Sequence, residues 1–125
     1  MARSSPHKTI DCFLNSKPEY TKELFHHFID EYRKIGLITL HPAKTMIGVA
    51  NDKKRIAWIT RFGKNFIHIV FPFSKSYPDN LCFQKIAQVP GHTQFNHHFR
   101  MLHKEDINDE VKYFMKLAYQ NEMTQ

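Results

Sequence analysis

The sequence predicts an α+β domain with N-terminal helices, an antiparallel sheet of about five strands and a C-terminal helix. Apolar residues recur at helical spacing near both ends of the chain. The middle instead contains β-branched and aromatic runs separated by turn residues. Most links between these runs are too short to hold a crossover helix, so the neighbouring strands should pair antiparallel.

The chain has 125 residues, which is enough for one domain with one hydrophobic core. We expect that core to span residues 9–119. No apolar run approaches the roughly 18 residues that a membrane span needs, and residues 1–15 contain no apolar signal segment. The sequence therefore predicts a cytoplasmic protein without a membrane partner.

Two helices are expected before the sheet. Thr9 can cap a short helix that runs through Leu14, and Pro18 suits the first position of a second helix. Gly36 supplies the stop expected after that second helix. The apolar stripe of the second helix consists of Leu24, Phe25, Phe28, Tyr32 and Ile35.

Five strands are expected between Gly36 and the last helix. They cover residues 45–50, 56–62, 66–73, 81–89 and 94–102. Residues 51–55 and 63–65 are typical hairpin loops, Pro90-Gly91 is a turn, and residues 74–80 form a longer loop. The sheet should therefore be built largely from hairpins.

The last predicted helix begins after Asn108. The side chain of Asn108 can accept a hydrogen bond from the first turn, and two acids follow where they favour the helix dipole. The apolar stripe consists of Ile107, Val111, Phe114 and Ala118. From Gln120 onward we expect the chain to fray.

Positive charge is concentrated in the predicted sheet. Between Gly36 and Arg100, nine Lys and Arg residues face only Asp52 and Asp79, a balance of +7. The rest of the chain sums to −1, and the whole chain to +6. A charge imbalance confined to one part of a fold indicates a negatively charged partner for that part.

One face of the predicted sheet mixes aromatic and basic side chains. Strand alternation places Ile67, Ile69, Phe71, Phe73, Phe95, His97, Phe99 and Met101 toward the core. The opposite face carries Phe66, His68, Val70, Asn96, His98, Arg100 and Leu102, and Ile56, Trp58 and Thr60 can join it. Rings interleaved with guanidinium groups suit an anionic or aromatic ligand. The competing interpretation is a face half covered by a helix, with Arg100 paired to an acid.

The sequence predicts no catalytic residue, metal ligand or cofactor. No serine or cysteine lies in a nucleophile elbow, and the four glycines form no phosphate-binding loop. Of the nine histidines, the adjacent His97 and His98 face opposite sides of a strand, so they cannot chelate a metal together. The balance is against an enzyme, and a small hydrolase stays open as an alternative.

Several segments together resemble a known family. They are residues 9–14 (TIDCFL), 44–49 (KTMIGV), 56–59 (IAWI), 96–102 (NHHFRML), 106–110 (DINDE) and 117–119 (LAY). Over residues 9–119 the chain is similar to an uncharacterised bacterial and archaeal domain. That domain occurs alone or at the C-terminus of proteins labelled predicted transport proteins, some with an endonuclease-like N-terminal part.

The resemblance implies no activity, because that family has none established. Its recurrent positions correspond to Lys44, Thr45, His98, Arg100 and Ala118-Tyr119. In that frame Lys44 begins the first strand and Arg100 lies in the last, so the two would meet if those strands were neighbours. The competing interpretation pairs both residues with helix acids such as Asp106 or Asp109.

The first functional hypothesis is a non-enzymatic module that binds nucleic acid through its basic sheet face or hairpin loops. Its candidate phosphate contacts are Lys53, Lys54, Arg55 and Lys64, with Trp58 or Phe66 stacking on bases. The second hypothesis is a pocket for a small anionic or aromatic ligand, formed by Lys44, Trp58, His68, His98 and Arg100. Arg61 is a further candidate, because a charge in a strand needs an acid, a water or a ligand. A protein-interaction module is a third possibility.

Overall fold

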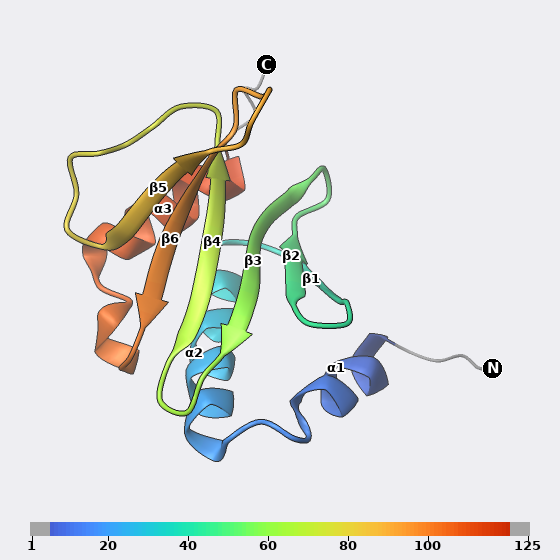
Figure 1. Ribbon diagram of the computed structural model, residues 1–125. Coiled ribbons are helices and arrows are strands. Elements are labelled where there is room, and N and C mark those ends of the chain that lie inside the picture. The colour runs from blue at the N-terminus through green and yellow to red at the C-terminus, as the bar shows by residue number, and fades with distance from the viewer. Residues whose placement is uncertain (1–5, 121–125) are drawn as a thin grey trace.

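A six-stranded antiparallel sheet with helices packed on one face makes up the domain in the computed structural model (Figure 1). The structure describes residues 6–120. The helices are α1 (Pro6–Leu14), α2 (Glu19–Ile35), the short 3-10 helix η1 (Lys104–Asp106) and α3 (Asp109–Gln120). The strands are β1 (Thr39–Pro42), β2 (Ile47–Ala50), β3 (Arg55–Phe62), β4 (Ile67–Phe73), β5 (Phe83–Gln88) and β6 (Phe95–Met101). The predicted α+β class is confirmed, with one strand more than expected.

The strand order is β1-β2-β3-β4-β6-β5, and every neighbouring pair is antiparallel. β1 is the strand that the sequence did not predict. It is four residues long, ends on Pro42 and lies at the edge of the sheet, where a residue without an N–H group is tolerated. The last two strands form a hairpin that closes at the predicted Pro90-Gly91 turn, with the Val89 N–H donating to Gln94 O over 2.8 Å.

The helices largely match their predicted limits. α1 begins at Pro6, earlier than the predicted Thr9. α2 begins at Glu19, so Pro18 is the N-cap and not the first helical residue as predicted. The helix ends before Gly36 as predicted, and the Gly36 N–H donates to Tyr32 O over 3.2 Å. No helix in the described chain combines the length and the apolar character needed to cross a membrane.

Helix α3 has the predicted N-cap, but it continues further than predicted. The Val111 N–H donates to Oδ1 of Asn108 over 2.9 Å, which confirms Asn108 as N-cap. Gln120 still belongs to α3, so fraying does not begin there. The rest of that prediction concerns residues 121–125, which lie outside the described residues.

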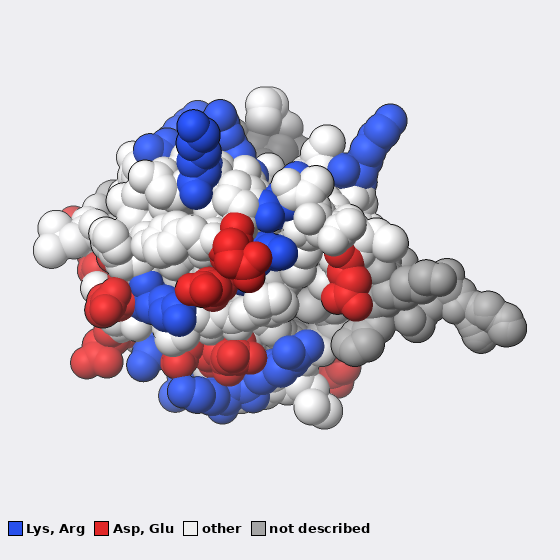
Figure 2. All heavy atoms as spheres, turned by 90° about the horizontal axis from the view of Figure 1, so that it is seen from below, with Lys and Arg blue, Asp and Glu red and all other residues white. Residues whose placement is uncertain are grey.

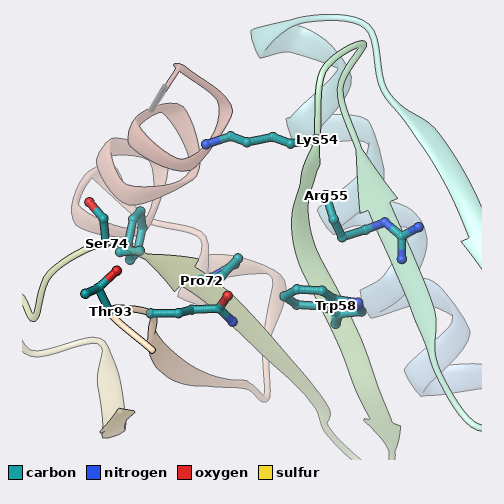
Figure 3. A pocket seen from close by; sticks show the side chains of 8 residues that line it. Lys54, Arg55, Trp58, Pro72, Ser74 and Thr93 are labelled. Carbon is teal, nitrogen blue, oxygen red and sulfur yellow. The ribbon is translucent and has the colours of Figure 1, made fainter. Parts of the chain in front are cut away.

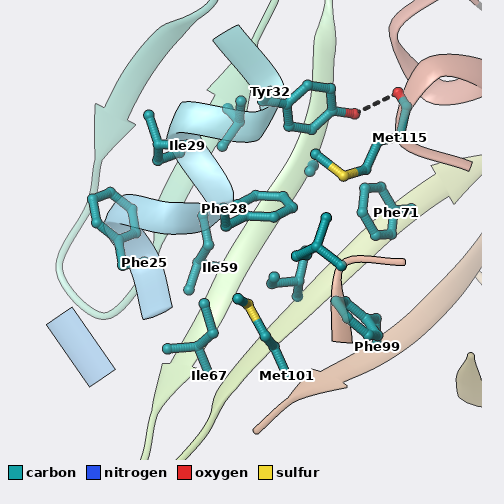
Figure 4. Packing of buried hydrophobic residues seen from close by; sticks show 14 of the residues in the cluster. Phe25, Phe28, Ile29, Tyr32, Ile59, Ile67, Phe71, Phe99, Met101 and Met115 are labelled. Atoms are coloured by element: carbon teal, nitrogen blue, oxygen red, sulfur yellow. Dashed lines mark hydrogen bonds between the residues drawn. The ribbon is translucent and has the colours of Figure 1, made fainter. Parts of the chain in front are cut away.

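The core lies between the sheet and the pair α2 and α3 (Figure 4). The predicted core face of the strands is buried, except that Phe95 is only half-buried. Tyr32 is fully buried and its hydroxyl donates to Met115 O over 2.8 Å, which ties α2 to α3. The pair α2 and α3 therefore covers one face, and in Figure 1 these two helices lie behind the strands, while α1 lies beside the β1 edge of the sheet.

The opposite face, which we call the outer face, carries no helix within residues 6–120 (Figure 1). The competing interpretation of a mixed face half covered by a helix is therefore wrong. The sequence did not reveal this arrangement, because each helix has one apolar stripe that could have packed on either face of the sheet. The outer face includes Trp58, His68, Val70, His98 and Arg100.

A first break in strand register moves one predicted residue off the outer face. Val49 pairs with Ala57 and Ala50 pairs with Arg55, so Ile56 is an extra residue in β3. Ile56 is 1% exposed and belongs to the core. The prediction that Ile56 joins the mixed face is wrong, because a bulge interrupts the alternation that the prediction assumed.

Two further breaks in strand register place basic side chains on the outer face. Ile59 pairs with Ile69, but Arg61 pairs with His68, so Arg61 lies on the outer face and not on the core side that alternation from Ile59 would give. In the same way Phe83 pairs with Phe99, while Lys85 pairs with His98. Bulges that re-aim side chains in this way are common beside functional sites.

Candidate functional site

Five polar side chains on the outer face lie in two rows, each made of residues that are opposite one another on neighbouring strands. The first row is Arg61 of β3, His68 of β4 and Arg100 of β6, and the second is Val70 of β4, His98 of β6 and Lys85 of β5. Side chains directly opposite each other on a sheet face have Cβ atoms about 5 Å apart. These residues therefore form one patch, and we call Arg61, Lys85 and Arg100 the cation cluster.

The two histidines of this patch are bonded to each other. Nε2 of His68 lies 2.9 Å from Nδ1 of His98. Burial lowers the pKa of His68, and positive charge from His98, Arg100, Arg61 and Lys85 lowers it further. Burial and then Lys85 lower the pKa of His98. Both imidazoles are therefore neutral at pH 7, and one ring donates the shared hydrogen bond to the other.

An aromatic ring supports the two arginines. The guanidinium carbon of Arg100 lies 4.6 Å from the ring centre of Phe66, and that of Arg61 lies 5.7 Å from it. The ring folds back over the turn between β3 and β4, where a Cβ at Gly63 would collide with it. Gly63 thus leaves the space in which Phe66 lies under both guanidinium groups.

The cation cluster lacks carboxylate partners. Among the side chains of residues 10–120, the ion pairs join Lys22 to Glu19 and join Lys34 and Lys112 to Glu31, all on the helices. No ion pair within that range involves Arg100, so the predicted alternative of an acid-paired Arg100 is wrong. In Figure 2, the outer face lies along the top edge, where basic side chains stand without acidic ones. This face therefore holds a net positive charge that an anion can neutralise.

A shallow hollow of about 510 Å³ adjoins the cation cluster. Its lining consists of Met46, Trp58, Thr60, Val70, Gln94, Asn96 and His98. Trp58 is half-buried and is the single tryptophan of the chain. A lining that combines apolar side chains with amide groups suits a planar ring that carries hydrogen-bonding edges.

A second hollow of about 330 Å³ lies on the other side of Trp58 (Figure 3). Its lining consists of Lys54, Arg55, Trp58, Pro72, Phe73, Ser74, Thr93 and Gln94. Arg55 lies against the backbone of Gly48, where a Cβ would collide with its guanidinium group. The two hollows share Trp58 and Gln94, so the tryptophan stands between the cation cluster and the loop that joins β2 to β3.

The predicted basic loop residues lie at opposite ends of β3. Lys53 and Lys54 precede the strand, and Arg55 is its first residue. Lys64 follows its last residue, Phe62, in the turn beside Arg61. The loops therefore bracket the outer face and do not form a single basic patch.

Lys44 is the predicted site residue that the structure separates from the others. It is exposed in the turn between β1 and β2, so the prediction that it begins a strand is wrong. The hydrogen bond from the Ala43 N–H to Met46 O, 2.8 Å long, closes that hairpin and leaves Lys44 in the loop. Because β3 and β4 lie between β2 and β6, Lys44 and Arg100 are not brought together.

Lys85 is the functional candidate that sequence reasoning missed. In a regular strand it would share a side with Phe83, which packs against the core, so alternation directs it inward. Only the extra residue opposite β6 brings it beside His98. Nothing in the local sequence marks that bulge.

No group of three or more His, Cys, Asp or Glu side chains in the described chain could hold a metal ion. No protein-family model, curated protein or solved structure matches the chain. The arrangement itself offers two chemical capacities: binding of an anion by the cation cluster and stacking of a ring on Trp58.

Proposed function

We propose that the outer face binds single-stranded nucleic acid without cleaving it. The observation that carries this proposal is the cation cluster, which has no carboxylate partner among the side chains of residues 10–120 and adjoins a hollow lined by Trp58. Single-strand binders combine backbone-tracking cations with aromatic side chains on which bases stack. Both components stand here on one uncovered sheet face.

The shape of the face favours a single strand over a duplex. Stacking on Trp58 requires a base that is free of its partner, and no helix formed by residues 6–120 protrudes from the outer face to enter a groove. β3 is eight residues long, so the path from the Lys64 turn to the Lys53 turn is about 26 Å. That length accommodates on the order of 4 nucleotides, within the range of known single-strand sites.

The test is binding of a labelled oligonucleotide of about ten nucleotides, followed by fluorescence anisotropy across about 50 to 200 mM salt. We expect affinity to fall steeply with salt. The double variant Arg61→Gln, Arg100→Gln should lower the slope of log K against log salt by about 1.4, because each single-strand phosphate contact contributes about 0.7.

The matched control is Lys116→Gln, which removes a charge from an exposed site on α3, on the side of the sheet opposite the outer face. It should leave the slope unchanged. Trp58 supplies an independent readout, since intrinsic fluorescence comes from this one tryptophan and should be quenched by a stacked base. Absent or salt-insensitive binding would contradict the proposal, as would equal affinity for a duplex of the same sequence.

A small anionic or aromatic ligand is the second candidate, favoured by the hollow of about 510 Å³ beside His98. Its site would comprise Trp58, His68, His98 and Arg100, without Lys44. A thermal-shift screen of anionic metabolites should then find a ligand that stabilises the wild type and not Arg100→Gln. Stabilisation that persists in the variant would argue against this candidate.

A further inference from the structure

We propose that the outer face recognises a terminal phosphate, with the phosphomonoester at the end of a single strand on the cation cluster and the end base in the hollow beside Trp58. This inference rests on the proposed function and names the part of the nucleic acid that the site selects. The inference follows from the positive charge of the cation cluster and from the position of the hollow beside that cluster.

The cation cluster carries more charge than one internal phosphate neutralises. Arg61, Lys85 and Arg100 bring three positive charges, and the residues directly opposite them on the neighbouring strands are the neutral pair His68 and His98. An internal phosphodiester carries a single negative charge. A phosphomonoester carries about −1.5 to −2 at pH 7 and has three strong acceptor oxygens. The terminal group therefore matches the cluster better in both charge and number of acceptors.

The donors of the cation cluster are grouped around the pair His68 and His98. The cluster and the pair together come from four adjacent strands, β3, β4, β6 and β5, in two neighbouring rows. Arg61 and Arg100 flank His68, and both lie over the ring of Phe66. Guanidinium forks bind phosphate oxygens in pairs, and Lys85 adds a point charge from the far side of His98. Cations grouped in this way around one histidine pair can share the charge of one phosphomonoester.

The hollow lies where the attached nucleoside would be. His98 belongs both to the patch of the cation cluster and to the lining of the hollow. Trp58 and Val70 occupy the row next to the one that contains His68, about 7 Å further along the strands. The amides of Gln94 and Asn96 line the hollow and bond to each other over 2.9 Å, which leaves Oε1 of Gln94 and Nδ2 of Asn96 for a base edge. One nucleotide thus spans the cluster and the hollow.

The experiment compares oligonucleotides of one sequence that differ only at their ends: hydroxyl at both ends, 5′-phosphorylated, and 3′-phosphorylated. Anisotropy is measured at about 150 mM salt, where charges more than a Debye length away are screened. We expect one phosphorylated end to raise affinity about ten-fold or more, through charge-assisted bonds. A hydroxyl-ended strand one nucleotide longer controls for added charge and should not reproduce the gain.

The variants Arg100→Gln and Lys85→Gln should abolish the gain, and Lys116→Gln should keep it. All three side chains are exposed, so the variants should fold like the wild type. A nucleoside monophosphate should compete with the strand, while the nucleoside should not. If inorganic phosphate competes as well as the monophosphate, the hollow has no part and the inference is overturned.

The remaining outcomes separate this inference from the proposed function. Equal affinity for phosphorylated and hydroxyl-ended strands would overturn end recognition and leave single-strand binding standing. A gain that persists in Arg100→Gln would place the phosphate elsewhere and would also overturn the inference. No binding of any strand would overturn both.

Discussion

His68 of β4 and His98 of β6 share one hydrogen bond across the sheet, 2.9 Å from Nε2 to Nδ1, in the middle of a patch that also holds three cations. The pair can accept one proton and keep this bond, but a second proton breaks it. Arg61, Lys85 and Arg100 oppose even the first proton, as the lowered pKa of His68 indicates. A bound anion would offset their charge.

We therefore predict that binding of nucleic acid strengthens as pH falls. In the free protein the pKa values of both histidines are lowered from 6.5, and a bound phosphate should raise them. A group whose pKa is higher in the bound state takes up a proton on binding, so affinity rises as pH drops below the bound-state pKa. One linked proton gives at most about ten-fold per pH unit.

The measurement is binding of a hydroxyl-ended strand at pH values of about 7.5 and 5.5 and constant ionic strength, since internal phosphates do not titrate in this range. The variants His68→Asn and His98→Asn should flatten the pH dependence. His26→Gln, at an exposed position of α2, is the control and should retain it. An affinity that ignores pH in the wild type would refute this prediction.

Gly63→Ala should weaken binding by displacing Phe66. A Cβ at this position would collide with the ring of Phe66, which lies under Arg61 and Arg100. Gly63 does not have a positive φ, so alanine adds a steric clash without backbone strain. Relieving such a clash typically costs about 1 to 3 kcal/mol of stability.

Oligonucleotide affinity and urea unfolding would both be measured for Gly63→Ala. Phe66→Leu removes the ring without the clash and should also lower affinity, because the guanidinium groups lose their support. If Gly63→Ala binds like the wild type, the ring does not organise the arginines.

His97 should make the fold sensitive to acid. It is fully buried, Nδ1 donates to Phe95 O over 3.0 Å, and Nε2 accepts from the Tyr77 N–H over 3.1 Å, so the ring is neutral. Burial lowers its pKa from 6.5, which means that below pH 6.5 the unfolded chain binds more protons than the folded one. The stability that the neutral ring provides is complete above that pH and is lost progressively as pH falls toward the folded-state pKa.

Urea unfolding between about pH 7.5 and 5 would show this loss, and one proton contributes at most about 1.4 kcal/mol per pH unit. His97→Gln should be less stable than the wild type at pH 7.5 and should have a smaller slope below 6.5. His68 and His98, whose pKa values are also lowered, should supply the slope that remains. An unchanged slope in His97→Gln would contradict the prediction.

Tyr32→Phe should loosen the contact between α2 and α3. The hydroxyl of Tyr32 is buried and donates to Met115 O over 2.8 Å (Figure 4). A buried hydrogen bond contributes about 1 kcal/mol to the free energy of unfolding. Urea unfolding would measure the loss, and Tyr113→Phe, at a side chain that is 59% exposed, is the control that should change nothing.

Local patterns were enough to predict most elements. The Asn108 cap, the Gly36 stop and the alternation of Ile67 to Phe73 each depend on residues a few positions apart, and all three were correct. β1 was missed because four residues ending in Pro42 carry too little pattern, and only a place at the sheet edge makes them a strand.

The candidate site was predictable only in part. His68, His98 and Arg100 were placed on one face correctly, because β4 and β6 are regular over their whole pairing. Arg61 and Lys85 join them only through bulges, and Ile56 leaves the face through another. Each bulge depends on pairing between two strands, so no single strand reveals it.

By itself, the sequence determined the α+β class, the excess of positive charge in the sheet and the core face of the central strands, since these follow from composition and short-range periodicity. The tertiary structure alone decided which face the helices left open, that Lys44 stands apart from Arg100, and that three cations gather around two histidines. The physical reason is that strand order, register and helix placement are set by long-range packing, which brings together residues that are distant along the chain.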